Sequence, residues 1–207
     1  MKRTLIILLI LIISMLNIPV CANSVLPAPL AGETVYTATI TLTAKAVGDS
    51  YGGGIVAYIL KEGDPGYDAG EQHGLIAATE DQSTGMAWSN ITSTLVGGTD
   101  AAYGTGAANT TKIIAQVGHS SSAAKVCADY TVTVNSVTYD DWYLPSKDEL
   151  NKLYLKKDAV GGFTDNYYWS SSGYSANFAW FQAFNVGSQD SEVNECDTYR
   201  VRAVRAF

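Results

Sequence analysis

A helix start followed by aromatic segments of strand length constrains the fold of this chain more than any other feature. Ser146 and Glu149 have the Ser-x-x-Glu spacing of a capping box, in which each residue satisfies a backbone amide left unpaired at the helix start. The segments 167–170, 179–185 and 199–205 are rich in residues that favour sheets and predict short antiparallel strands. One capped helix among several short strands predicts an α+β domain.

The part of the chain before this helix predicts a smaller set of elements. Residues 55–60 form a continuous apolar run of strand length, and residues 75–78 predict a second short strand. Helices are expected over 109–118 and from 120 to 127, because each stretch begins with residues that cap helices well. Residues 131–138 are consistent with either a strand or a loop.

The first 22 residues have the features of an export signal. Lys2 and Arg3 precede an apolar stretch over 5–16 that is too short and too early to span a membrane. The small residues before Ala22 fit cleavage after that position. The alternative is a lipoprotein with Cys21 as the lipidated residue, which the preceding Pro-Val pair disfavours.

The chain is therefore expected to have three parts. Residues 1–22 are the signal peptide, residues 23–50 an N-terminal extended arm or strand, and residues 51–207 a ligand-binding domain. The arm leaves open a contact with a second copy, so a homo-oligomer stays an alternative. We expect no membrane span in the mature chain, and a location that is secreted or at the cell surface.

The net charge of the chain restricts the classes of partner that it can bind. The net charge is −7, and it falls to −9 once the signal peptide removes two basic residues and no acidic one. An acidic chain repels a phosphate backbone, so we expect no nucleic-acid partner.

Several short motifs follow one another in a fixed order. They are Gly53 to Val56, Gln72 to Ala78, Asp81 to Gly85, Ala123 to Cys127, Asp141 to Leu150, Tyr168 to Ser172 and Val201 to Arg205. This ordered set resembles the C-terminal domain family of the Legionella collagen-like adhesin, which is related to the Fibrobacter major paralogous domains. The resemblance covers about residues 51–207.

The resemblance implies an extracellular binding module. Its fold would be that of the C-type-lectin and formylglycine-generating-enzyme group, a twisted, mainly antiparallel sheet with flanking helices and long loops. The named adhesin binds sulfated glycosaminoglycans as a trimer, but this chain has no collagen-like Gly-x-y repeat. Some proteins of the same fold group are variable binding proteins diversified by retroelements, and the polar and aromatic segment 167–199 is compatible with that alternative.

Catalytic residues are sparse. The chain has two histidines, His73 and His119, and neither belongs to a nucleophile elbow or to a zinc-binding pair. A thiol oxidase of the formylglycine-generating group would need closely paired cysteines, whereas Cys127 and Cys196 lie far apart in the sequence. We therefore expect a protein that is not an enzyme, with an enzyme on the same fold as an alternative.

The binding face is predicted in the C-terminal segment. Trp142, Trp169 and Trp180 are expected in the core, and alternation along the strands would then turn other side chains outward. Arg200 and Arg202 are candidates for binding a sulfate or carboxylate, unless an internal acid such as Asp141, Asp148 or Glu149 pairs with the terminal arginines. The candidate ligand-binding residues are Tyr174, Asn177, Gln182, Asn185, Gln189, Asp190, Arg200 and Arg202.

Two further features are weaker. One presumed loop is rich in oxygen ligands and leaves Ca²⁺ open as a cofactor, although its spacing matches no EF-hand and we expect none: Asp190, Glu192, Asn194, Glu195 and Asp197. Cys127 and Cys196 are a candidate disulfide in an oxidising compartment, with a plain buried cysteine at Cys127 as the alternative.

These features favour a secreted or surface-exposed, non-enzymatic domain of adhesin type that displays its C-terminal segment to a glycan or protein ligand. A structural subunit of a surface assembly, built through the arm, is the further alternative.

Overall fold

A computed structural model describes residues 44–193 and 198–207. The predicted signal peptide, most of the arm over 23–50, and Cys196 lie outside the described residues. The described residues belong to one compact unit. Its first residues are already part of the fold, since Lys45 N donates to Gln72 Oε1 at 2.7 Å and Gly48 N donates to Val56 O at 2.9 Å.

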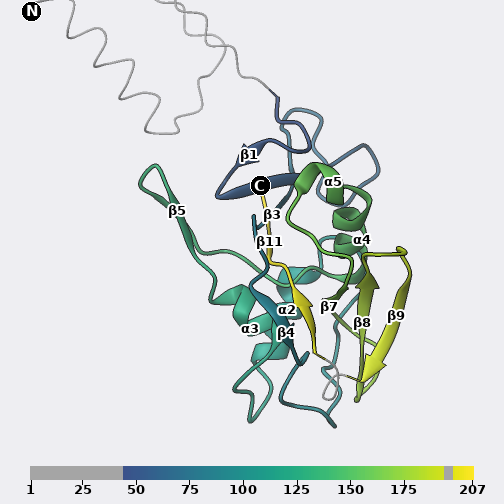
Figure 1. Ribbon diagram of the computed structural model, residues 1–207. Helices are drawn as coiled ribbons and strands as arrows, with labels where there is room; N and C mark the ends of the chain where they lie inside the picture. Colours follow the sequence, from purple (N-terminus) through teal and green to yellow (C-terminus); the bar gives the residue numbers. More distant parts are fainter. Residues whose placement is uncertain (1–43, 194–197) are drawn as a thin grey trace, which may run out of the picture. The chain divides into compact units, whose positions relative to one another are not determined.

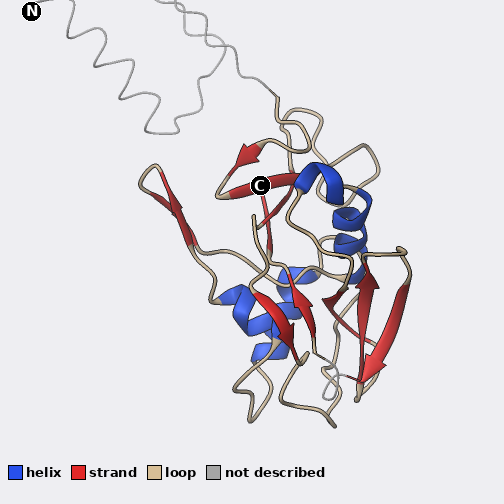
Figure 2. Ribbon diagram, viewed as in Figure 1, coloured by secondary structure: helices blue, strands red, loops and turns tan. Residues whose placement is uncertain are grey.

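The described residues form an α+β domain with three sheets (Figures 1 and 2). The four-stranded antiparallel sheet has the order β1-β2-β3-β11, and its strands are Ser50–Tyr51, Gly54–Ile59, Gly74–Ala77 and Val204–Ala206. The five-stranded sheet has the order β4-β10-β7-β8-β9, and its strands are Ser83–Met86, Tyr199–Val201, Tyr167–Gly173, Phe178–Ala183 and Gln189–Val193. All described pairs are antiparallel except β10 with β7.

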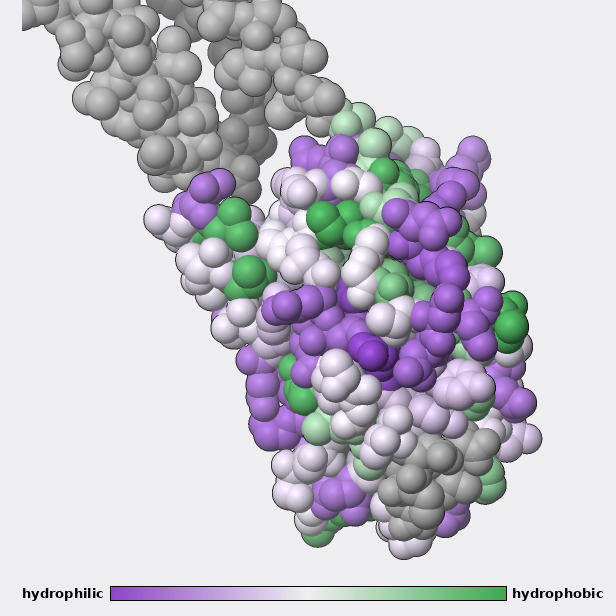
Figure 3. All heavy atoms as spheres, viewed as in Figure 1, coloured by the Kyte–Doolittle hydropathy of each residue, from purple (hydrophilic) through white to green (hydrophobic). Residues whose placement is uncertain are grey.

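The third sheet is the hairpin of β5 (Val132–Val134) and β6 (Val137–Tyr139), the region that the sequence left open between strand and loop. Asn135 and Ser136 both have positive φ, at 51° and 64°, as a tight two-residue hairpin turn requires. The hairpin projects from the body of the domain (Figures 1 and 3), and Val134 and Val137 are exposed on it.

Four helices are described. They are α2 (Gly106–Ile114), α3 (Ala123–Ala128), α4 (Lys147–Leu155) and α5 (Lys157–Val160). The predicted capping box at α4 is confirmed, because Ser146 Oγ accepts from Glu149 N and Glu149 Oε2 accepts from Ser146 N at 2.7 Å. The second predicted helix begins later than expected, since Ser122 is the residue that caps α3.

Two chain segments pass from one sheet to the other side by side. The first runs from β3 to β4, and the second runs back from β10 to β11, so that β11 pairs with β3 and β10 pairs with β4. The predicted terminal strand over 199–205 is thus two strands, interrupted at Arg202 and Ala203. Gln82 Oε1 accepts from Ala203 N at 2.5 Å, which joins the two segments at the crossing.

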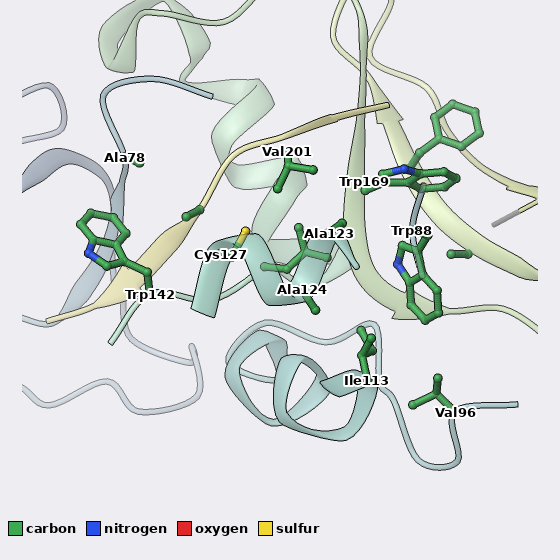
Figure 4. Close-up of a cluster of buried hydrophobic side chains, with 14 of the residues drawn as sticks. Ala78, Trp88, Val96, Ile113, Ala123, Ala124, Cys127, Trp142, Trp169 and Val201 are labelled. Atoms are coloured by element: carbon green, nitrogen blue, oxygen red, sulfur yellow. The ribbon is translucent and has the colours of Figure 1, made fainter. Parts of the chain in front are cut away.

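The larger core cluster lies between α2, α3 and the five-stranded sheet (Figure 4). Trp142 and Trp169 are buried, as predicted, together with Trp88. Each indole donates to a backbone carbonyl: Trp88 to Ser170 at 2.7 Å, Trp169 to Met86 at 2.8 Å and Trp142 to Tyr139 at 3.1 Å. Buried tryptophans are stable when the indole N–H finds such a partner.

The prediction for Trp180 is wrong. Trp169 pairs directly with Phe181 across β7 and β8, so those two side chains share the inward face and Trp180 lies on the opposite face. Phe181 is 8 % exposed, while Trp180 is only half-buried. Alternation along β7 does not turn the neighbours of Trp169 to solvent, because Tyr168 and Ser170 are also fully buried and both faces of this strand are covered.

Candidate functional site

The β7–β8 hairpin presents exposed aromatic side chains. Tyr174 is 62 % exposed and Phe178 is 37 % exposed. The turn between them is closed by Tyr174 N and Ser175 N, which both donate to Phe178 O, at 2.8 and 3.1 Å. Sequence reasoning placed Tyr174 and Asn177 on display, and both are exposed here. Phe178 was not among the predicted ligand-binding residues.

Trp180 joins this surface from β8. Its ring centroid lies 5.4 Å from that of Tyr174 at an interplanar angle of 89°, an edge-to-face contact. Phe178 and Trp180 are two residues apart on one strand and therefore share a face. Together with Lys147 we call Tyr174, Phe178 and Trp180 the hairpin corner.

Lys147 is the charged member of the hairpin corner, and sequence reasoning missed it. It is the first residue of α4, and its Nζ lies 3.6 Å from the Trp180 ring centroid in a cation–π contact. A cation at a helix start is disfavoured by the helix dipole, and this local conflict was the one available signal. Within the described residues its ammonium has no carboxylate partner.

The backbone of α4 is held in place beneath this lysine. Lys147 N donates to Ser172 Oγ at 3.0 Å, and Asp148 N donates to Ala101 O at 3.0 Å. Gln189 Nε2 donates to Lys147 O at 2.7 Å, which joins β9 to the helix start. Gln189 was predicted to contact ligand, and the structure shows its side-chain amide bound to the backbone at the start of α4.

Glu149 fixes the same helix start from inside. It is fully buried, and Glu149 Oε1 accepts from Gly104 N at 3.1 Å and from Tyr143 Oη at 3.3 Å. Burial raises the pKa of the Glu149 carboxyl, and the hydrogen bonds from Ser146, Gly104 and Tyr143 oppose that shift. The corner therefore rests on a helix start whose first backbone amides are hydrogen-bonded.

Gln182 does not belong to the displayed surface. It was predicted to be exposed, but it is fully buried, and its Nε2 donates to Gly187 O at 2.7 Å inside the β8–β9 turn. The reason is that α4 covers this face of β8 beyond Trp180, as the α4–β8 contacts show. Asn185 is exposed, but it lies at the far end of β8 in that turn, away from the hairpin.

The presumed loop that carries Asp190 begins as strand β9. The prediction of a loop is wrong here, because β9 pairs with β8 from Gln189 to Val193, and an edge strand tolerates charged side chains. Asp190 is exposed and accepts from Ser191 N at 2.8 Å. The candidate calcium set is completed by four more residues. Asn194, Glu195 and Asp197 lie outside the described residues, and so does the side chain of Glu192. Elsewhere in 44–193 and 198–207, no cluster of three acidic, His or Cys side chains could hold a metal ion.

Arg202 and Arg200 were candidates for anion binding, and both instead pair with Asp81. Arg202 is fully buried, and its Nη2 lies 2.7 Å from Asp81 Oδ1, while Arg200 Nη1 donates to Asp81 Oδ2 at 2.8 Å. The alternative of an internal ion pair is thus confirmed for these two arginines, but their partner is Asp81 and not one of the three acids considered from the sequence. For Arg205 the acid was named correctly, since Arg205 Nε lies 2.6 Å from Asp141 Oδ1.

Every N–H of the Arg202 guanidinium has a partner at the sheet crossing. Apart from Asp81, the acceptors are Ala78 O at 3.0 Å, Gly161 O at 3.4 Å and Gly162 O at 2.5 Å. The guanidinium also lies 4.2 Å from the Phe163 ring centroid. A side chain that is buried and fully hydrogen-bonded is a structural element rather than a ligand contact.

The two histidines and Cys127 lie in structural surroundings. His119 Nε2 is 2.9 Å from Ser122 Oγ, but Ser122 is buried and its hydroxyl also accepts from Lys125 N at 2.9 Å as the α3 cap. His73 Nδ1 lies 3.2 Å from Phe207 O. Cys127 is fully buried, and burial raises the pKa of its thiol. Its proposed disulfide partner Cys196 is outside the described residues.

The fold and the hairpin corner define a small α+β domain that displays aromatic side chains from the β7–β8 hairpin. Residues 77–205 match the family model of the Lcl C-terminal domain, so the chain belongs to the Lcl C-terminal domain family. Comparison with curated proteins gives no match. Family membership supports an adhesin-like surface domain and is consistent with a secreted or surface location. Among the helices of the described residues, none has the length and apolar character needed to cross a membrane.

Proposed function

We propose that this chain is a secreted or surface-exposed, non-enzymatic domain of adhesin type that binds an extracellular glycan through the hairpin corner. The observation that carries the proposal is the exposed pair Tyr174 and Phe178 beside the half-buried Trp180. Aromatic rings present apolar faces at low entropic cost, and such faces suit the C–H face of a sugar ring. Family membership supports the surface role.

A non-enzymatic role is supported by the surroundings of the polar residues that could react. Ser122 beside His119 is committed to a helix cap, and Glu149 is committed to the start of α4. The C-type-lectin-like fold remains part of the proposal, supported by the mixed α+β architecture with mainly antiparallel sheets. The four side chains of the corner include no carboxylate, and the proposal includes no calcium ion.

The experiment is binding of the protein recovered after export to an immobilised glycan array and to a panel of extracellular matrix proteins. We expect retention on a subset of glycans and about fivefold weaker binding for Tyr174→Ala, which removes one exposed stacking ring worth about 1 kcal/mol. Tyr67→Ala is the matched control, because Tyr67 is an exposed tyrosine in a different loop and should change nothing. Binding to no glycan, or to proteins alone, would overturn the proposal.

A further inference from the structure

We propose that the hairpin corner recognises a sugar acid, meaning a pyranose that carries a single carboxylate. The inference rests on the proposed function and adds the chemical class of the ligand. The sugar ring packs against the aromatic side chains, and its carboxylate meets Lys147 Nζ. Three observations on the corner lead to this assignment.

The first observation is the unpaired charge of Lys147. Its ammonium is held 3.6 Å from the Trp180 ring centroid, and within the described residues it makes neither an ion pair nor a hydrogen bond. The cation–π contact holds the ammonium over the ring beside Tyr174, so a ligand stacked there brings its substituents to an ammonium that makes no hydrogen bond within the described residues. A carboxylate is the ligand group that uses such donors best.

The second observation is that the helix start beneath Lys147 offers no competing anion site. The first amides of α4 are already used, since Lys147 N donates to Ser172 Oγ, Asp148 N to Ala101 O and Glu149 N to Ser146 Oγ. An anion therefore cannot bind in the usual way at the helix N-terminus. The side-chain ammonium is the cationic donor that remains at the corner.

The third observation sets the number of charges. Lys147 is one cation next to the exposed Asp148, on a chain with a net charge of −7. A polyanionic chain would place further negative charges against an acidic surface, which costs free energy, whereas one carboxylate matches one ammonium. Ser191 adds a neutral hydroxyl on the same face, because it pairs directly with Trp180 across β8 and β9.

The test uses two probes that differ in one group. Methyl β-D-glucuronide carries a carboxylate where methyl β-D-glucoside carries a hydroxymethyl group, and both are titrated into the exported protein while the Trp180 and Tyr174 ring signals are followed by NMR. We expect the glucuronide to bind about fivefold more tightly at low salt, as for an exposed ion pair near the upper end of its range. The preference should shrink as salt rises.

Matched variants separate charge from stacking. Lys147→Gln is expected to remove the preference for the glucuronide while leaving weak binding of the glucoside. Lys152→Gln is the control, because Lys152 is on the same helix and lies 4.4 Å from the Tyr58 ring centroid in a similar stack away from the corner. Tyr174→Ala should weaken both sugars alike.

The outcomes distinguish this inference from the proposed function. Equal affinity for the two sugars in the native protein overturns the sugar-acid assignment and leaves a neutral glycan site. A preference for the glucuronide that survives Lys147→Gln overturns it as well, because the charge would lie elsewhere. Failure of both sugars together with an empty glycan array overturns the proposed function itself. A preference lost only in Lys147→Gln supports the assignment.

Discussion

Replacing Asp81 by asparagine should destabilise the domain strongly, because it leaves a buried arginine without its counter-charge. Asp81 is 7 % exposed at its side chain, and it pairs with the fully buried Arg202, with Arg200 and with Tyr168 Oη at 3.1 Å. Breaking a buried pair by removing one partner typically costs about 3–5 kcal/mol. For a domain of this size, about 2–4 °C is lost per kcal/mol, so Tm should fall by roughly 6–20 °C.

The chain contains a matched control for this change. Arg205 and Asp141 form an ion pair of similar geometry, but the Asp141 side chain is 55 % exposed. Exposed pairs contribute about 0–1 kcal/mol, so Asp141→Asn should shift Tm by no more than about 4 °C. Urea unfolding followed by circular dichroism gives the two free energies of unfolding under identical conditions. Equal losses for Asp81→Asn and Asp141→Asn would refute the reasoning that burial decides the value of these pairs.

Two further predictions concern single side chains at helix starts. Burial raises the pKa of Glu149 above its usual value, so its contribution to stability is fully present below about pH 4.5 and is lost as pH rises through the folded pKa. Glu149→Gln should therefore make the urea midpoint of unfolding less dependent on pH between about pH 4 and 8. The same pH dependence in the variant as in the native protein would contradict this. Ser122→Ala removes the α3 cap and should cost about 1 kcal/mol in urea unfolding, with Ser120→Ala, an exposed serine outside the helix, as the neutral control.

The sequence predicted those elements that are determined by interactions between residues a few positions apart. The capping box at Ser146 and Glu149 is such a case, because both hydrogen bonds span three positions. The apolar run of β2 is another, since a mostly buried strand can be recognised from its own run of apolar residues. The existence of an internal ion pair for the terminal arginines could be anticipated from the need to neutralise charges near a core.

The features that the sequence did not predict depend on contacts between residues far apart in the chain. Asp81 and Arg202 are separated by 121 positions, and nothing near either residue identifies the other. Which side chains of β8 face the core depends on the pairing of Trp169 with Phe181 across β7 and β8. This pairing places Phe181 inward and Trp180 on the opposite face, although Trp180 is larger than Phe181. Lys147 became part of the candidate site only because α4 begins next to Trp180, which is a relation between two elements rather than a motif.

The crossing of the two sheets also constrains when the domain can fold. Its closing contacts join Ala78 to Arg202, 124 positions apart, and pair β11 with β3. Contacts of such high sequence separation form slowly, because the intervening chain loses conformational entropy before the contacts contribute any stabilising free energy. A ribosome must therefore release everything from β3 to β11 before the sheets can join. Until then the apolar strands β2 and β3 remain uncovered, and exposed apolar strands make an incompletely folded chain prone to aggregation.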